Sequence, residues 1–156
     1  MKSLSHINEE GNAAMVDVSD KTSSARVAIA SGSVTFPASV FQTLSDQDFL
    51  GKKGSILQTA VIAGIQGVKK TAELIPLCHQ INLTKIHLDI APGDNQFQIT
   101  CTVKCNGKTG VEMEALTGVS IAALTIYDMC KALSQDIVIS SVRLEQKKGG
   151  KNDFQR

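Results

Sequence analysis

Aromatic side chains are scarce: the 156 residues include no tryptophan, one tyrosine and five phenylalanines. Few rings are therefore available for bases to stack on, which disfavours single-stranded nucleic acid as a partner. The net charge is only +1, so no overall field attracts nucleic acid or an anionic membrane, and any basic site must be local. No apolar run of signal-peptide length opens the chain, and we find no stretch of membrane-spanning length. We therefore expect a cytoplasmic protein that binds neither nucleic acid nor membrane.

Cysteine is also scarce, and the four cysteines form neither a dense disulfide scaffold nor a CxxC pair. Cys101 and Cys105 share one face of an alternating segment, so buried free thiols are the simplest interpretation. A zinc site built from Cys78, His79, Cys101 and Cys105 is the alternative, although it lacks the usual close ligand spacing. We predict no dedicated metal site.

The composition is that of a globular protein, with 42% hydrophobic and 20% charged residues. A chain of this length can bury one core. We expect a single domain over residues 1–156, with an N-terminal arm to about residue 20 and a mobile basic tail over about 146–156.

Alternation of apolar and polar residues predicts four strands. The clearest runs cover about 85–90 and 97–105, and a turn at 92–95 joins them. The other two strands begin at Arg26 and Ile137. A short helical or irregular segment follows the first strand, and it leads into a polar loop that ends in GKKG.

Two long helices complete the pattern. Ser55 with Gln58, and Thr109 with Glu112, have the spacing of capping boxes. The first helix should run from Ser55 to about 75, where Pro76 ends it, and the second from about 111 to 133. The order strand, helix, strand, strand, helix, strand predicts an α+β fold, with two helices on one face of a four-stranded antiparallel sheet. The other face would need a cover, which favours association of subunits.

Asp128 and Lys131 lie three residues apart near the end of the second helix, so their side chains are neighbours. An exposed ion pair is the ordinary interpretation of this spacing. The surrounding segment LTIYDMCKAL is apolar, however, and a partly desolvated pair can act as an acid and a base.

Glu112 and Glu114 lie at the start of the same helix, where its dipole favours carboxylates for structural reasons alone. If Glu114 and Asp128 both act on a ligand, they lie about 21 Å apart along the helix. One small ligand can hardly reach both within a chain, so the site would be elongated or shared between subunits. We favour a shared site.

Basic residues and one histidine are the remaining candidates. His79 follows Pro76 in a loop, where it can donate to a phosphate or act as an acid, or can be an ordinary structural residue. Lysines next to glycine, as in GKKG and the tail KKGGK, can close over a polyphosphate or simply aid solubility. Neither segment has the spacing of a P-loop, and no dinucleotide-binding fingerprint is present.

Four segments carry a resemblance to a known family: HINEEGNAAMVDVSDK, TAVIAGIQGVKKTAELIPLCHQINL, NGKTGVEMEAL and AALTIYDMCKAL. From about residue 6 to 151 the chain resembles the cyclic pyranopterin monophosphate synthases, or molybdenum cofactor biosynthesis protein C. The resemblance implies a ferredoxin-like fold and a homohexamer, a trimer of dimers with its active site at a subunit interface. It also implies a phosphorus–oxygen lyase of molybdopterin synthesis that converts (8S)-3′,8-cyclo-7,8-dihydroguanosine 5′-triphosphate to cyclic pyranopterin monophosphate and diphosphate. No cofactor is required, and Mg²⁺ can accompany the triphosphate.

The same resemblance implies roles for individual residues. The expected catalytic residues are Asp128, Lys131 and Lys53. The expected substrate-binding residues are Leu77, Cys78, His79, Glu112, Met113, Glu114, Arg26, Lys69, Lys147 and Lys151. The chain departs from the family pattern at Gln80 and Ile81, where proline and leucine are usual, and this concerns the shape of the loop rather than the reaction. A non-catalytic module that binds a small metabolite is the alternative from another class.

Overall fold

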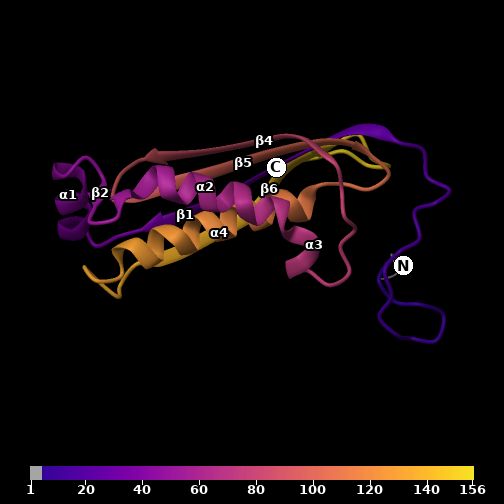
Figure 1. Cartoon of the computed structure of the whole chain (residues 1–156), viewed down its shortest axis with the longest axis horizontal. Helices are drawn as coiled ribbons and strands as arrows, with labels where there is room; N and C mark the ends of the chain where they lie inside the picture. The colour runs from indigo at the N-terminus through magenta and orange to yellow at the C-terminus, as the bar shows by residue number, and fades with distance from the viewer. Residues whose placement is uncertain (1–4) are drawn as a thin grey trace.

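The structure is a computed structural model that describes residues 5–156, so residues 1–4 of the expected arm lie outside the described part. Its main sheet has the strand order β4-β5-β1-β6-β7, and all neighbouring strands are antiparallel (Figure 1). The strands are β1 (Ser24–Thr35), β4 (Leu83–Pro92), β5 (Gln96–Gly107), β6 (Val138–Lys148) and β7 (Phe154–Gln155).

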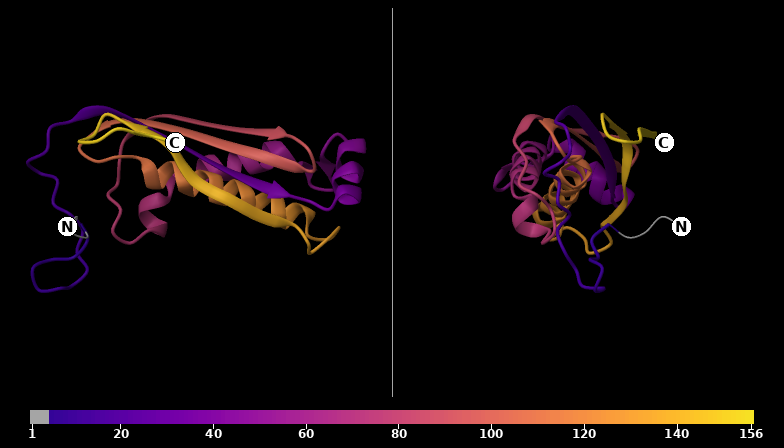
Figure 2. Two further views of the ribbon diagram at one scale, coloured as in Figure 1. Left: turned by 180° about the vertical axis from the view of Figure 1, so that it is seen from behind. Right: turned by 90° about the vertical axis from the view of Figure 1, so that its right-hand side faces the viewer.

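Helices α2 and α4 lie together on one face of this sheet, and the other face is open (Figure 2). The helices are α1 (Ala38–Asp46), α2 (Ile56–Lys69), α3 (Thr71–Leu74) and α4 (Glu112–Cys130). A small hairpin of β2 (Leu50–Gly51) and β3 (Gly54–Ser55) connects α1 to α2. The molecule is elongated, with α1 and the hairpin at one end and α3 and the N-terminal arm at the other (Figure 1).

The predicted α+β class, with an antiparallel sheet and two long helices, is confirmed, but the predicted count of four strands is wrong. The backbone N–H of Gly149 donates to the Asp153 carboxylate at 3.1 Å. Beyond this turn, Phe154 and Gln155 pair with Lys147 and Gln146. The segment that we expected to form the tail therefore begins inside β6 and adds a fifth strand to the sheet.

The two predicted helix caps have different outcomes. The Ser55 side chain accepts a hydrogen bond from the backbone N–H of Gln58 at 3.3 Å, so it caps α2 as predicted. α2 ends at Lys69, earlier than expected, and a separate turn follows as α3. The predicted cap of α4 is wrong, because no side chain caps this helix and Glu112 pairs with Lys147 instead.

The core lies between the helices and β5, whose alternate side chains Phe97, Ile99, Cys101, Val103 and Cys105 are all buried. The predicted buried free thiols are confirmed at positions 101, 105 and 130, while Cys78 is half-buried. Within residues 5–156, no group of three or more His, Cys, Asp or Glu side chains is placed to hold a metal ion. The zinc alternative therefore has no structural support.

Our expectation that no stretch is long enough to span a membrane is wrong for helix α4. By length and composition alone, this helix is long and apolar enough to cross a membrane. Half of this segment is buried inside the protein. Such burial is expected of a core helix that packs against the sheet.

Candidate active site

The three expected catalytic residues lie at one end of the molecule. Asp128 and Lys131 follow one another around the C-terminal end of α4, and the Lys131 ammonium lies 2.7 Å from the Asp128 carboxylate. Lys53 is in the turn between β2 and β3, and its charge helps to lower the pKa of Asp128. Residues 75 positions apart in the sequence are thus brought together because the hairpin and the end of α4 share one end of the fold (Figure 1).

The Asp128–Lys131 pair is not desolvated in the described chain, so of the two interpretations the exposed ion pair holds for the chain by itself. The side chains are 61% and 59% exposed. The hydrogen bond and charge of Lys131 lower the pKa of Asp128, and the same contact raises the pKa of Lys131. Both groups are therefore held in their charged forms near neutral pH. Proton transfer between them requires that something else covers the pair.

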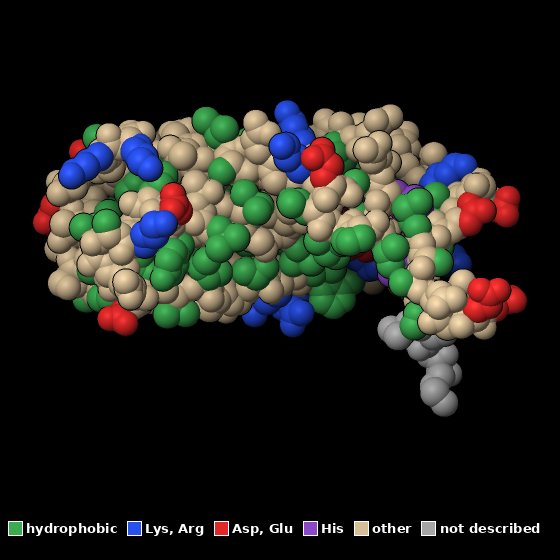
Figure 3. Space-filling view, turned by 60° about the horizontal axis from the view of Figure 1, so that its bottom comes forward, with side chains coloured by type: hydrophobic (Ala, Val, Ile, Leu, Met, Phe, Trp, Pro, Cys, Tyr) green, Lys and Arg blue, Asp and Glu red, His purple; other side chains and the backbone are tan. Residues whose placement is uncertain are grey.

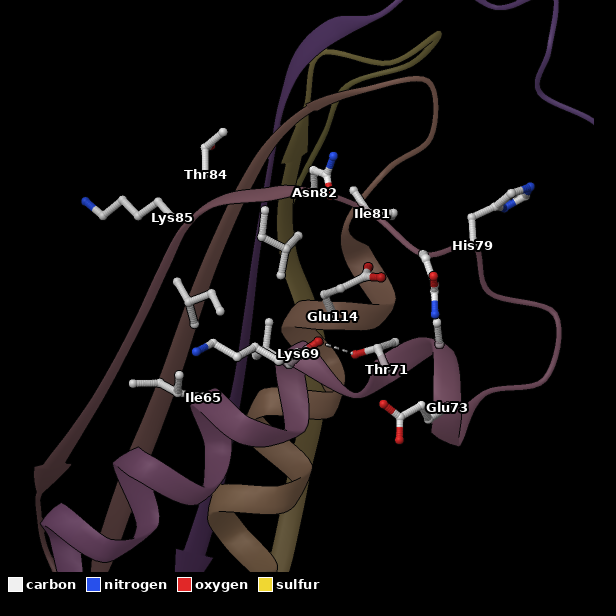
Figure 4. A pocket seen from close by; sticks show the side chains of 15 residues that line it. Ile65, Lys69, Thr71, Glu73, His79, Ile81, Asn82, Thr84, Lys85 and Glu114 are labelled. Atoms are coloured by element: carbon white, nitrogen blue, oxygen red, sulfur yellow. Dashed lines mark hydrogen bonds between the residues drawn. The ribbon is translucent and has the colours of Figure 1, made fainter.

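A cavity of about 850 Å³ lies at the other end, between the end of α2, α3 and the start of β4 (Figure 4). Glu114, in the first turn of α4, lines this cavity although it is only 4% exposed. Burial raises the pKa of the Glu114 carboxyl to about 7, and the nearby charge of Glu112 adds to the rise. Glu114 can therefore take up or release a proton near neutral pH.

Lys69 and His79 also line this cavity. Nε2 of His79 lies 2.8 Å from the carbonyl oxygen of Val16 in the N-terminal arm. Figure 4 shows the His79 ring pointing away from Glu114. Cys78 is adjacent, and burial together with the charge of Glu114 raises the pKa of its thiol. In the free chain His79 thus holds the arm in place beside the cavity.

A second, smaller cavity of about 200 Å³ lies where β1, β6 and the loop before α4 meet. Glu112 lines it and accepts a hydrogen bond from Lys147 at 3.0 Å. Arg26 donates to the carbonyl oxygens of Gly107 at 2.8 Å and Lys108 at 3.2 Å. Arg26 therefore holds the loop that carries Lys108, in addition to lining the cavity.

The fold divides the predicted site residues into two groups at opposite ends of α4. Lys53, Asp128 and Lys131 form one group. The other surrounds the two cavities and includes Lys69, Cys78, His79, Glu112, Glu114, Arg26, Lys147 and Lys151. Met113 is 39% exposed on the first turn of α4 and Leu77 is half-buried in the loop before β4.

Lysines of the smaller cavity are among the lining residues that the sequence did not single out. Lys21 and Lys108 both line the smaller cavity. They stand within segments that carry the family resemblance, DVSDK and NGKTG. No local pattern distinguishes them from solubilising lysines, because their proximity depends on how the arm crosses the loop before α4.

The structure is an α+β domain with cationic side chains gathered around the smaller cavity and at the Asp128 end of α4. The sequence profile of the MoaC family matches residues 15–150, and the chain belongs to this family. The resemblance predicted from the sequence is thereby confirmed.

Curated relatives agree with this assignment. A cyclic pyranopterin monophosphate synthase of Helicobacter hepaticus is 52% identical over 156 residues, covering 98% of this chain and 97% of the relative. A protein of the same name from Campylobacter jejuni is 49% identical over 96% of this chain and 95% of its own length. Molybdenum cofactor biosynthesis protein 1 of Drosophila melanogaster is 50% identical over 98% of this chain, which matches 27% of that longer protein.

Proposed function

We propose that the chain is a lyase of molybdenum cofactor biosynthesis that converts (8S)-3′,8-cyclo-7,8-dihydroguanosine 5′-triphosphate to cyclic pyranopterin monophosphate and diphosphate. Membership of the MoaC family supports this function, as does about 50% identity to proteins named cyclic pyranopterin monophosphate synthase. The structural observation that carries the proposal is that the Asp128–Lys131 pair lies at one end of the fold, where the charge of Lys53 also acts on Asp128.

Asp128, Lys131 and Lys53 would perform the proton transfers. Rearranging a guanine-derived ring requires protons to move on and off nitrogen, which an aspartate beside lysines can mediate as acid and base. In the free chain the ion pair keeps both partners charged. Substrate and a neighbouring subunit would cover the pair, and desolvation would then bring the two pKa values closer together.

The large cavity would bind the ring system of the substrate. Its volume of about 850 Å³ is within the roughly 300–1,000 Å³ that small-molecule sites occupy. Glu114 is the buried ionisable group at this cavity. Near neutral pH it can accept a hydrogen bond from a ring N–H or, when protonated, donate one to a ring nitrogen. The loop of Leu77, Cys78 and His79 would close one side, and Met113 would contact the ligand from the exposed surface of α4.

The cations around the smaller cavity would stabilise the phosphates. Attack on the α-phosphate with loss of diphosphate develops negative charge on the leaving group, which fixed cations stabilise. Arg26, Lys147 and Lys151 line that cavity. Lys69 lines the larger one. No cofactor is required in this scheme, and Mg²⁺ would enter with the triphosphate rather than at a dedicated protein site.

The complete enzyme would be a homohexamer, a trimer of dimers of ferredoxin-like subunits, acting in the cytoplasm. About 21 Å of helix separate Glu114 from Asp128, so a second subunit would place the Asp128 of one chain near the cavities of its neighbour. Hydrophobic side chains also gather on the outer surface of the helix layer (Figure 3). On the two helices of this layer, Ile62 of α2 is 62% and Leu124 of α4 is 56% exposed, which supports contact between subunits there.

The test is incubation of the purified protein with the cyclic GTP derivative. Release of diphosphate together with formation of a pterin supports the lyase. Binding of the compound without turnover would contradict it and would favour the non-catalytic metabolite-binding module.

A further inference from the structure

The smaller cavity concentrates positive charge from four separate segments. The arm, β1, the loop before α4 and the region from β6 into the tail each contribute. The six cationic residues that line it are Lys21, Arg26, Lys108, Lys147, Lys148 and Lys151. Glu112 is the one carboxylate in the lining of this cavity, and it is already paired with Lys147. So many like charges repel one another, and a bound anion would relieve that repulsion.

Contacts within the chain position these cations. Arg26 is fixed by the carbonyl oxygens of Gly107 and Lys108. The Lys108 ammonium donates to the carbonyl oxygen of Ser19 at 2.7 Å. Ser19 in turn is two residues from Lys21, so this bond docks the arm segment that carries Lys21 at the cavity. An ammonium has three donors, which leaves Lys108 able to bind a ligand while it holds the arm.

The size of the cavity limits what it can bind. About 200 Å³ is below the roughly 300–1,000 Å³ of sites that enclose a whole drug-sized molecule. A short chain of phosphates is small enough for this volume, and its high density of negative charge complements the cationic lining.

We propose that Lys21 and Lys108 bind the polyphosphate chain of the substrate, so that the N-terminal arm forms part of the binding site. The identity of the substrate rests on the proposed function, whereas recognition of a polyphosphate rests on the cavity itself. Neither residue is among those that the family resemblance assigns to the site. Together they would help to distinguish a triphosphate from a monophosphate.

The first experiment measures binding of inorganic tripolyphosphate and of inorganic phosphate to the full-length assembled protein by titration calorimetry. Tripolyphosphate should bind much more tightly than phosphate. Lys21→Met and Lys108→Met should each weaken tripolyphosphate binding roughly tenfold, the usual effect of losing one charge-assisted contact. Lys21→Arg, which keeps the charge, should restore most of the affinity. Lys104→Met is the matched control, because Lys104 is exposed on β5 and lines neither cavity; it should bind as the wild type does.

The second experiment measures turnover of the cyclic GTP derivative by the same variants. Lys21→Met should raise KM roughly tenfold and change kcat much less, since the lost contact is to the phosphates. Wild-type binding of tripolyphosphate by Lys21→Met, or equal affinity for phosphate and tripolyphosphate, would overturn the proposal. If the wild type bound tripolyphosphate through Lys21 but released no diphosphate from the substrate, the proposed function would be wrong and the polyphosphate site would stand.

Discussion

Asp128 and Lys131 illustrate why the chemistry of a residue depends on what covers it. Their contact lowers the pKa of Asp128 and raises the pKa of Lys131, which opposes proton exchange. An exposed pair of this kind contributes little to stability, since water already solvates both charges. The geometry therefore has little structural purpose within one chain, which is consistent with a role in a site that only an assembly completes.

We predict that Asp128→Asn and Lys131→Met each reduce kcat by about 100-fold or more, because general acid–base groups typically contribute factors of this size. The melting temperature should hardly change, as the side chains are exposed. Steady-state kinetics and thermal melting of the same samples check this. A variant that keeps a near-normal kcat would contradict the acid–base role, and a large fall in melting temperature would indicate a structural role instead.

Glu114 gives a prediction about pH. Because its pKa rises from 4.5 to about 7 on folding, the folded state binds the proton more tightly than the unfolded state does. Stability should therefore fall as pH rises from about 4.5 to 7, by an amount on the order of 1–3 kcal/mol. Glu114→Gln should remove this pH-dependent part of the free energy of unfolding. Urea unfolding of wild type and variant at pH 5 and pH 7.5, at one protein concentration, measures the difference. If wild type and variant show the same difference between the two pH values, Glu114 is not the responsible group.

At the scale of elements, the crossing of α2 and α4 depends on small residues. A Cβ atom added at Gly64 would lie 2.3 Å from a methyl group of Leu88 and 2.9 Å from the carbonyl oxygen of Gly118. The second neighbour is backbone and cannot move without shifting α4. Close approach of the helices therefore requires glycine here, although glycine disfavours a helix interior by about 1 kcal/mol.

Accordingly, Gly64→Ala should destabilise the protein by about 1–2 kcal/mol, because overpacking of the crossing outweighs the gain in helix propensity. Gly93→Ala is the control, since its Cβ would meet Gln96 atoms at 3.7 Å or more, an ordinary contact. Its effect should stay within about 0.5 kcal/mol. Chemical unfolding compares the two variants, and stabilisation by Gly64→Ala would show that the helices can separate at little cost.

The strands and helix caps also show which features can be predicted from the sequence and which cannot. Strict alternation predicted β4 and β5, because each side chain of a half-buried strand faces either core or solvent. β7 was missed because a strand of two residues is too short to show alternation of apolar and polar side chains. Its pairing depends on the Gly149–Asp153 turn. Likewise, the cap expected from Thr109 fails because α4 begins later, at Glu112 with Val111 in the N-cap position, and Glu112 pairs with Lys147, 35 residues away. Contacts between distant segments leave no mark on local spacing.

The candidate site shows the same limit at the level of the whole molecule. The residues of the Asp128 end and of the Glu114 end could be named from the resemblance, and helix geometry predicted that they lie far apart. Lys21 and Lys108 could not be selected, because only the folded chain brings the arm across the loop before α4. Whether the site is complete therefore depends on how the subunits assemble.

Mixing two inactive variants answers that question. Glu114→Ala removes a group at one end of α4 and Asp128→Ala removes a group about 21 Å away. In a hybrid oligomer with sites shared between subunits, some sites combine the intact Glu114 of one chain with the intact Asp128 of its neighbour. Co-expressed chains carrying different affinity tags, purified over both, should therefore recover up to about a quarter of wild-type activity on random association into dimeric sites. Homo-oligomers of each variant, purified in parallel, are the controls. Since a site within one chain always contains one defective residue in every hybrid, failure of doubly purified hybrids to exceed those controls would refute the shared site.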